Sequence, residues 1–251
     1  MPGATANSVR LTAAALTGRS EDHVYRHEWL GCALQPGVSD AFGQMRSAAA
    51  GAGLDLQAIS GFRGFERQLR IWNEKYAGIR PVLARDGLPL AVESLEPAAR
   101  IDAILQWSAL PGASRHHWGT DLDVIDRAAV PAGAGVRLVP AEYAPGGWFA
   151  PLDLWLRDHA ADYGFFRPYD RDRGGVQPEP WHLSYAPLAT VAQQSLTAAV
   201  LATTLADADL LGRDLVLARL DELHRRFVQA VALPPAAALE ARALSRAARP
   251  S

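Results

Sequence analysis

Residues 114–123 read Ser-Arg-His-His-Trp-Gly-Thr-Asp-Leu-Asp, and an alternation of polar and apolar side chains begins inside them. Across residues 120–125, Asp121 and Asp123 alternate with apolar residues, which is the period of a strand with one buried face. Both aspartates therefore point to the same face of that strand. Gly119 supplies a permissive backbone position for the corner that precedes it. The stretch predicts a sheet whose polar face carries functional side chains.

A second stretch, residues 179–182, reads Glu-Pro-Trp-His. His116, His182 and one of the two aspartates make a donor set that suits a catalytic zinc site, where three protein ligands leave a fourth position open. Glu179 precedes Pro180, which favours extended backbone. In a regular strand, positions 179 and 182 would point to opposite faces. We therefore expect a turn near Pro180, a strand that starts at about the next residue, and Glu179 close to the metal without being a ligand.

A third stretch, Ser60 to Arg63, reads Ser-Gly-Phe-Arg and is followed by Gln68. The Arg63 guanidinium can brace a carbonyl oxygen that becomes negative, or bind a terminal carboxylate through two hydrogen bonds. Residues 64–77 have a helical pattern. Positions 63 and 68 are therefore expected to lie near each other at the start of a helix.

Together the three stretches resemble the zinc D-alanyl-D-alanine carboxypeptidases related to vancomycin resistance, and their L,D-carboxypeptidase relatives. That family shows Ser-x-His-x-x-Gly-x-x-x-Asp, then Glu-x-x-His, with Ser-Gly-Tyr/Phe-Arg upstream. All three occur in this order over residues 60–182. The resemblance implies one zinc ion per chain, held by His116, Asp123 and His182.

The resemblance also implies roles around the metal. Glu179 is expected to act as general base and Arg63 as electrophilic helper. Asp121 stands where relatives usually carry a small residue, and it either orients a ligand imidazole or competes as a ligand. The substrate-binding residues are expected to be Gln68, Ser114, Ser60, Trp118 and Trp181, the two tryptophans as pocket wall.

The implied function is zinc-dependent hydrolysis of peptidoglycan-derived peptides, with release of C-terminal D-Ala. Alternatives are an L,D-carboxypeptidase, an endopeptidase on wall peptides, or a zinc-stabilised binding domain without catalysis. The presence of both Glu179 and Arg63 favours the enzyme. Residues 174–177 read Gly-Gly-Val-Gln, where relatives often have an aromatic residue, so the stereochemical preference stays open.

Three other histidines are expected to have structural roles outside the metal site. His117 adjoins a ligand candidate and is expected to point elsewhere, at the surface or outside the metal shell. His23 and His27 are four residues apart and are interpreted as one solvated face of a helix.

Composition limits the classes of binding partner and metal site that can be expected for this chain. The chain has 251 residues, 49% of them hydrophobic, with net charge -2 and one cysteine. This charge gives no reason to expect nucleic acid or an anionic membrane as a partner. Cys32 alone excludes an intrachain disulfide framework and a multi-cysteine zinc site. No apolar run approaches the roughly 18 residues of a membrane span. The oligomeric state is left open.

Residues 11–17 are too short and too polar for a convincing signal-peptide core. We therefore expect a cytoplasmic protein. The periplasm or cell envelope is the alternative, because peptidoglycan matures outside the cytoplasm.

The predicted fold class is α+β, with a small antiparallel sheet that carries the zinc ligands and helices packed on it. Helices are expected at 38–52, with Ser39 as N-cap, at 96–110, and between Pro151 and Gly164.

The predicted organisation places a metallopeptidase domain at residues 1–187, with its motif-bearing core at 54–187. Residues 78–95 are a loop or lid candidate. Residues 188–251 turn Ala- and Leu-rich and are expected to form a helical C-terminal extension that is separable from the zinc site.

Overall fold

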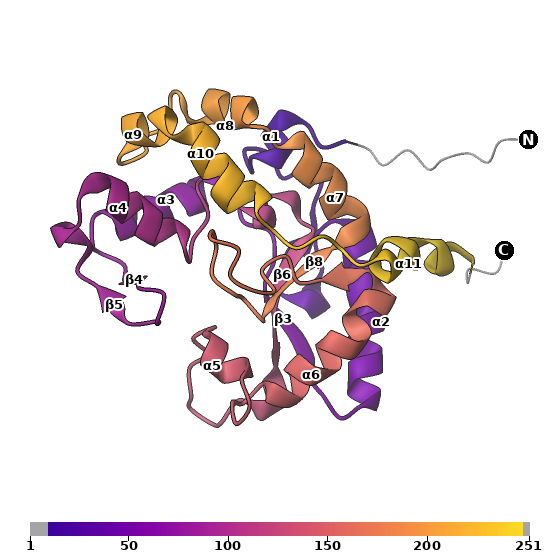
Figure 1. The fold of residues 1–251 in the computed structure, drawn as a ribbon. Coiled ribbons are helices and arrows are strands. Elements are labelled where there is room, and N and C mark those ends of the chain that lie inside the picture. Colours follow the sequence, from indigo (N-terminus) through magenta and orange to yellow (C-terminus); the bar gives the residue numbers. More distant parts are fainter. Residues whose placement is uncertain (1–9, 248–251) are drawn as a thin grey trace, which may run out of the picture.

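The computed structural model describes residues 10–247 and has a four-stranded antiparallel sheet at its centre (Figure 1). In spatial order the strands are β3 (Leu56–Ser60), β6 (Asp121–Asp126), β8 (His182–Tyr185) and β7 (Phe165–Phe166). The register places Asp123 opposite His182 on one side and Ser60 on the other. Polar residues of the two central strands therefore meet at one end of the sheet.

Helices surround this sheet, and two short hairpins lie beside it. The α-helices are α1 (Ala13–Leu16), α2 (Pro36–Gly51), α3 (Phe65–Tyr76), α4 (Pro97–Leu105), α5 (Pro140–Tyr143), α6 (Ala150–His159), α7 (Ala186–Ser195), α8 (Ala198–Leu205), α9 (Arg213–Ala218), α10 (Leu220–Leu223) and α11 (Ala236–Ala247). A π-helical segment, His224–Gln229, continues α10. The hairpins pair β1 (Tyr25–Arg26) with β2 (Ala33–Leu34), and β4 (Val82–Leu83) with β5 (Pro89–Leu90). Short 3-10 helices are η1 (Glu28–Leu30), η2 (Val92–Ser94), η3 (Arg115–Trp118), η4 (Arg127–Ala129) and η5 (Ala160–Tyr163).

Two hydrophobic cores hold the layers together. One joins the apolar face of the sheet to α2 and α6, with Leu122 and Leu183 from the sheet and Phe42 and Leu152 from the helices. The other joins α3 and α4 to the C-terminal helices. In Figure 1, α2 and α6 lie to one side of the sheet, and α3, α4 and α8 to α10 lie to the other. The predicted α+β class, an antiparallel sheet covered by helices, is confirmed.

Several predicted boundaries differ from the structure. Helix α2 begins at Pro36, in the first-turn position that proline favours. Ser39 therefore lies inside the helix and its Oγ donates to the Pro36 carbonyl at 2.8 Å, so its assignment as N-cap is wrong. The helix expected at 96–110 ends at Leu105, after which the backbone carbonyl of Gln106 accepts a hydrogen bond from Gln177.

The His23–His27 stretch is not a helix. Tyr25–Arg26 pairs as strand β1 with β2, because the chain doubles back after η1. The ring of His23 packs edge-on against Phe62 at a centroid distance of 5.6 Å. The interpretation of the two histidines as one helix face is therefore wrong.

The loop or lid candidate at 78–95 contains the β4–β5 hairpin and η2. Trp107 Nε1 donates to the carbonyl of Ala84 at 3.1 Å, and Arg85 pairs with Asp172 on the opposite loop. These contacts tie the hairpin to two other parts of the chain.

Much of the C-terminal stretch packs into the second core. Leu201 of α8 and Val216 of α9 are fully buried in the cluster that also contains Trp72 of α3 and Ile104 of α4. The division after residue 187 stays a prediction about sequence organisation. In space, helices from both sides of that division form one hydrophobic core.

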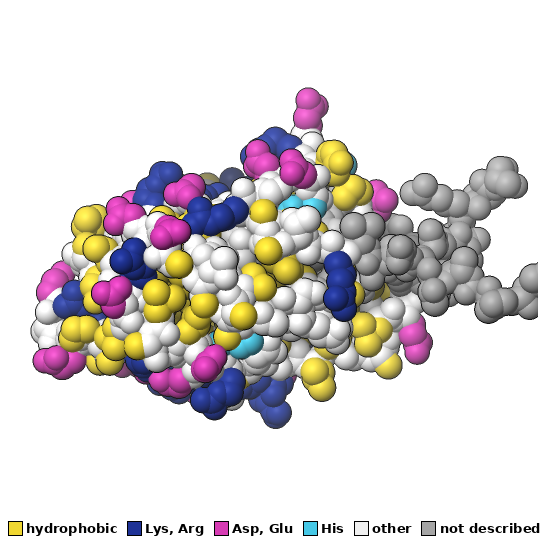
Figure 2. Space-filling view, turned by 90° about the horizontal axis from the view of Figure 1, so that it is seen from above, with side chains coloured by type: hydrophobic (Ala, Val, Ile, Leu, Met, Phe, Trp, Pro, Cys, Tyr) yellow, Lys and Arg dark blue, Asp and Glu magenta, His cyan; other side chains and the backbone are white. Residues whose placement is uncertain are grey.

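The face of the molecule in Figure 2 mixes charges of both signs with hydrophobic side chains. Among the described residues, no single helix has the length and hydropathy to cross a membrane. Helices α7 and α8 pass that test only jointly, and they are bent by 72° relative to each other.

Candidate metal centre

Three elements bring two imidazoles and one carboxylate together. His116 comes from η3, Asp123 from β6 and His182 from β8, and one donor atom from each lies within 4.8 Å of the others. His116 Nε2 is 3.4 Å from Asp123 Oδ2, and His182 Nδ1 is 3.3 Å from Asp123 Oδ1. All three side chains are buried.

Each histidine has its other ring nitrogen in a hydrogen bond. His116 Nδ1 lies 2.9 Å from the carbonyl of Gly61, and His182 Nε2 lies 3.0 Å from Asp121 Oδ1. These oxygens accept, so in the neutral rings the hydrogen sits on those nitrogens and the lone pairs face Asp123. Asp123 Oδ1 is itself buried without a hydrogen-bond partner. Three electron-pair donors thus converge with no hydrogen between them, a geometry that a cation satisfies.

The charge around His182 favours the same conclusion. Burial alone lowers the pKa of an imidazole, but the neighbouring carboxylates of Asp121, Asp123 and Glu179 raise the pKa of His182 well above its usual range. A site that draws a proton this strongly stabilises positive charge. A divalent cation on these donors takes the place of that proton.

Asp121 lies behind His182. Its Oδ1 also accepts from Arg115 Nε at 2.8 Å, and its Oδ2 accepts from Thr120. Although burial opposes ionisation, the Arg115 guanidinium and His182 hold the pKa of Asp121 well below its usual range. Arg115 also donates to Ser184 at 2.7 Å. This network fixes the His182 ring, as carboxylates behind metal-bound histidines commonly do.

A turn delivers Glu179 to the same place. The His182 amide donates to the Glu179 carbonyl at 3.1 Å, and the Glu179 amide donates to the Tyr169 carbonyl at 3.0 Å. The strand starts at His182, one residue later than expected. Glu179 Oε2 then lies 3.3 Å from His182 Nδ1, outside the three-residue cluster.

These side chains open into a cleft of about 330 Å³. Among the predicted site residues, the cleft is lined by Arg63, Ser114, His116, Asp123, Glu179, Trp181 and His182. Sequence reasoning therefore identified most of the chemical groups along its wall. Their roles in binding and catalysis stay predictions.

Gln68 needs a correction, because it lies behind the cleft wall. Its side chain is fully buried, its Oε1 accepts from Arg63 Nη1 at 2.8 Å, and its Nε2 donates to the Ala109 carbonyl at 2.7 Å. Both ends of the amide therefore have partners within the protein. Gln68 holds Arg63 in position instead.

Two further substrate-binding assignments also need correction. Trp118 is fully buried in the helical core, where its Nε1 donates to the Leu16 carbonyl at 3.2 Å. Ser60 lines a separate cavity beside Cys32, because it sits where the register between β3 and β6 shifts. Neither side chain lines the cleft.

His117 is fully buried, so its expected surface position is wrong; it does lie outside the metal cluster. Its Nδ1–H donates to the Arg63 carbonyl and its Nε2 accepts from the Gly112 amide at 3.2 Å. Burial lowers the pKa of His117 to about 3, so the ring is neutral near pH 7. It thereby fixes the backbone of Arg63.

Sequence reasoning missed several residues of the cleft, among them Lys75 and Tyr169. Tyr169 lies edge-on to the His182 ring at a centroid distance of 5.1 Å. Lys75 lies seven residues after Gln68 in α3, which is two turns along one helix face. That spacing was a usable signal, because Gln68 was already placed near the site.

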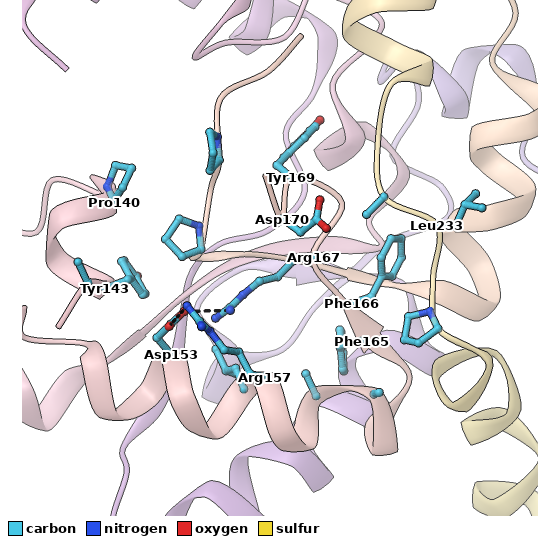
Figure 3. A pocket seen from close by; sticks show the side chains of 18 of the residues that line it. Pro140, Tyr143, Asp153, Arg157, Phe165, Phe166, Arg167, Tyr169, Asp170 and Leu233 are labelled. Atoms are coloured by element: carbon cyan, nitrogen blue, oxygen red, sulfur yellow. Dashed lines mark ion pairs between the residues drawn. The ribbon is translucent and has the colours of Figure 1, made fainter. Parts of the chain in front are cut away.

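A larger cavity, of about 640 Å³, lies beyond the Glu179 segment (Figure 3). Pro178 and Pro180 line it, whereas Glu179 lines the cleft. Among the residues that the structure describes, no histidine lines this cavity, and Arg157 and Arg167 both point to Asp153, at 2.7 and 2.9 Å. Size therefore does not identify the reactive site here. The two prolines stiffen the segment that presents Glu179.

A buried pair of histidines and an aspartate, with a glutamate beside them in a cleft, is an arrangement that suits a metallopeptidase. Residues 31–188 match the family model described as VanY, D-alanyl-D-alanine carboxypeptidase. The match spans more than half of the chain, so the chain belongs to this family of peptidases.

Individual relatives are similar over smaller parts. An uncharacterized protein of Haemophilus influenzae is 33% identical over 121 residues, covering 47% of this chain and 92% of that protein. A D-alanyl-D-alanine carboxypeptidase of Enterococcus faecium is 37% identical over 84 residues, which are 32% of this chain and 22% of that protein. The solved structure of the LdcB LD-carboxypeptidase has a TM-score of 0.50 at 20% identity, covering 84% of this chain and 80% of that chain. That last likeness concerns the fold.

Proposed function

We propose that this peptidase is a zinc-dependent carboxypeptidase that removes C-terminal D-Ala from peptidoglycan-type peptides. One observation supports a metal at this site. The lone pairs of His116 and His182 converge on Asp123, whose Oδ1 has no hydrogen-bond partner among the described residues. Two imidazoles and a carboxylate are a donor set that suits zinc and leaves a position open. The family supports the substrate class.

A zinc ion bound there would lower the pKa of a water molecule towards roughly 7 and polarise the scissile carbonyl. Glu179 lies in the cleft and outside the donor set, so it is placed to take a proton from the attacking water. It then passes a proton to the leaving amine. The proline-flanked turn keeps its carboxylate beside His182 during both transfers.

Arg63 would hold the substrate's terminal carboxylate. It lines the cleft, while its Nη1 is fixed by Gln68 and its backbone carbonyl by His117. A guanidinium fixed on one side presents its remaining N–H groups in a defined direction, which suits a carboxylate. Ser114 lines the same cleft and adds a neutral hydrogen-bonding group.

The decisive test compares free-acid and C-terminally amidated peptides ending in D-Ala-D-Ala, with zinc-loaded protein. We expect kcat/KM to fall at least tenfold on amidation, because a charge-assisted contact is lost. Comparable rates would instead indicate an endopeptidase. Cleavage confined to peptides with an L-residue before the terminal D-Ala would indicate an L,D-carboxypeptidase.

Glu179→Gln separates catalysis from metal binding. We expect it to retain zinc and fold but lose most hydrolysis, because its carboxylate acts on water rather than on the metal. Metal analysis and kinetics on the same preparation check this. Unchanged turnover would refute the assigned base, and loss of zinc would make Glu179 a ligand. A wild-type protein that binds zinc but turns over no peptide would be a binding domain.

A further inference from the structure

Four basic side chains line the cleft, and three of them have evident tasks. Arg115 is paired with buried Asp121 at 2.8 Å, and Arg63 is braced by Gln68. Arg137 lies 4.0 Å from Glu142, and its side chain is 75% exposed to solvent. Lys75 is different, because its ammonium group has no hydrogen bond or ion pair with any other residue that the structure describes.

Lys75 and Arg63 approach the cleft from opposite ends of one helix. Arg63 lies two residues before the start of α3, and Lys75 lies in its last turn. The rise of an α-helix separates Phe65, the first residue of α3, from Lys75 by about 15 Å. The two side chains therefore reach the cleft from different backbone positions and can contact different anionic groups of one bound chain. An extended peptide advances about 3.3–3.6 Å per residue, so groups of successive residues reach different points of the cleft.

The surroundings of Lys75 disfavour its positive charge. Burial and repulsion from Arg80 and Arg63 outweigh attraction by Glu179 and lower the pKa of Lys75 to about 8. At neutral pH the ammonium is still protonated, yet no anion of the described chain pairs with it. A partly desolvated cation that faces a cleft without a partner is suited to an anionic ligand.

We propose that Lys75 is a specificity-determining residue that binds a second carboxylate of the peptide substrate, on the N-terminal side of the scissile bond. This proposal rests on the proposed function. In a carboxypeptidase that releases D-Ala, the group beyond the scissile bond carries only the terminal carboxylate assigned to Arg63. A second anion must therefore come from the part of the peptide that is retained.

The test uses matched peptides ending in D-Ala-D-Ala, with Glu or Gln at each of the three preceding positions. For the wild-type zinc protein we expect Glu to be preferred over Gln at least tenfold in kcat/KM at one position. Lys75→Met should bring this ratio close to one, and Lys75→Arg should restore it in part. Arg70→Met, which removes an exposed cation from the same helix, should keep the wild-type ratio.

Calorimetric affinities of the same peptide pairs report on Lys75 independently of turnover. A wild-type protein with no Glu preference at any position would overturn the proposal. So would a preference that Lys75→Met leaves intact. If the wild-type protein cleaves none of the peptides but still binds Glu forms through Lys75, the proposed catalysis fails while this assignment stands.

Discussion

Asp121 shares one oxygen between Arg115 and His182, at 2.8 and 3.0 Å, inside the fully buried end of β6. Asp121 would therefore act on a bound metal through the His182 ring rather than directly. Because losing such an outer partner typically costs 10–100-fold in metal affinity, we expect Asp121→Asn to weaken zinc binding by about that factor. Competition with a chelator measures it.

Asp126 provides the matched control for this prediction. It is a buried carboxylate of the same strand, and it accepts from the Asp55 and Ala128 amides away from the cluster. Asp126→Asn should leave zinc affinity unchanged. If Asp121→Asn removed zinc as completely as Asp123→Ala, Asp121 would be a ligand and the assignment of the two aspartates would need reversal.

Gly119 forms the corner between His116 and the strand. Its φ is +64°, and an added Cβ would lie 2.2 Å from Val24 Cγ1. Left-handed backbone costs an L-residue about 1–2 kcal/mol, and the overlap adds to that cost. We expect Gly119→Ala to lower the free energy of unfolding by about 2 kcal/mol or more, measured by denaturant titration.

Gly53 separates the two contributions to that cost. Its φ is +81°, but an added Cβ would meet nothing within 4 Å. Gly53→Ala should therefore cost only the backbone part. Equal losses in the two variants would mean that Val24 moves aside freely and that the corner is not tightly packed.

Helix α3 organises the side of the cleft that carries Arg63 and Lys75. Gln68, in its first turns, braces Arg63 with one end of its amide and is anchored to Ala109 by the other. We expect Gln68→Leu to reduce the preference for free-acid over amidated peptides several-fold and to raise KM more than it lowers kcat. Gln68→Glu should retain more of the preference than Gln68→Leu, because its carboxylate still accepts from Arg63 although it loses the donation to Ala109. Steady-state kinetics on both peptide types provide the measurement.

A purely structural role for Gln68 would leave the acid-to-amide ratio unchanged while lowering stability. Direct substrate binding by Gln68 predicts something else. Gln68→Glu would then repel the terminal carboxylate and lose the preference altogether. Rates of the two Gln68 variants on free-acid and amidated peptides therefore distinguish the three roles.

At the scale of the whole molecule, the C-terminal helices complete the core around α3 and α4. Leu201, Val216 and Phe227 bury against it, and Gln193 of α7 accepts from the same Arg115 that pairs with Asp121. We expect a chain ending at residue 189 to lack a cooperative thermal transition, because the apolar sides of α3 and α4 would face water.

A chain ending at residue 234 is the comparison, since it keeps α7 to α10 and lacks α11. It should unfold cooperatively and bind zinc. Calorimetry and metal analysis of both truncations decide the matter. Cooperative unfolding and zinc binding by the shorter chain would restore the separable extension that the composition predicts.

The sequence by itself determined the sheet-borne cluster and the direction of its side chains. Alternation over residues 121–124 of β6 assigns Asp121 and Asp123 to one face, and the turn expected near Pro180 is present, with the His182 amide donating to the Glu179 carbonyl. Both signals are local, because strand period and proline geometry act over a few residues. The family, the antiparallel sheet and the group of residues along the cleft were predictable for that reason.

Only the tertiary structure decided which residues line the cleft and which lie behind it or in the core. Gln68 and Trp118 both lie in or beside the recognisable motifs. In the folded chain, however, Gln68 lies behind Arg63, and Trp118 is buried in the hydrophobic core. Lys75 enters the cleft because α3 runs beside it, and the helices after residue 187 join the core of α3 and α4. Such outcomes depend on burial and hydrogen-bond partners from distant segments, and local sequence patterns do not encode them.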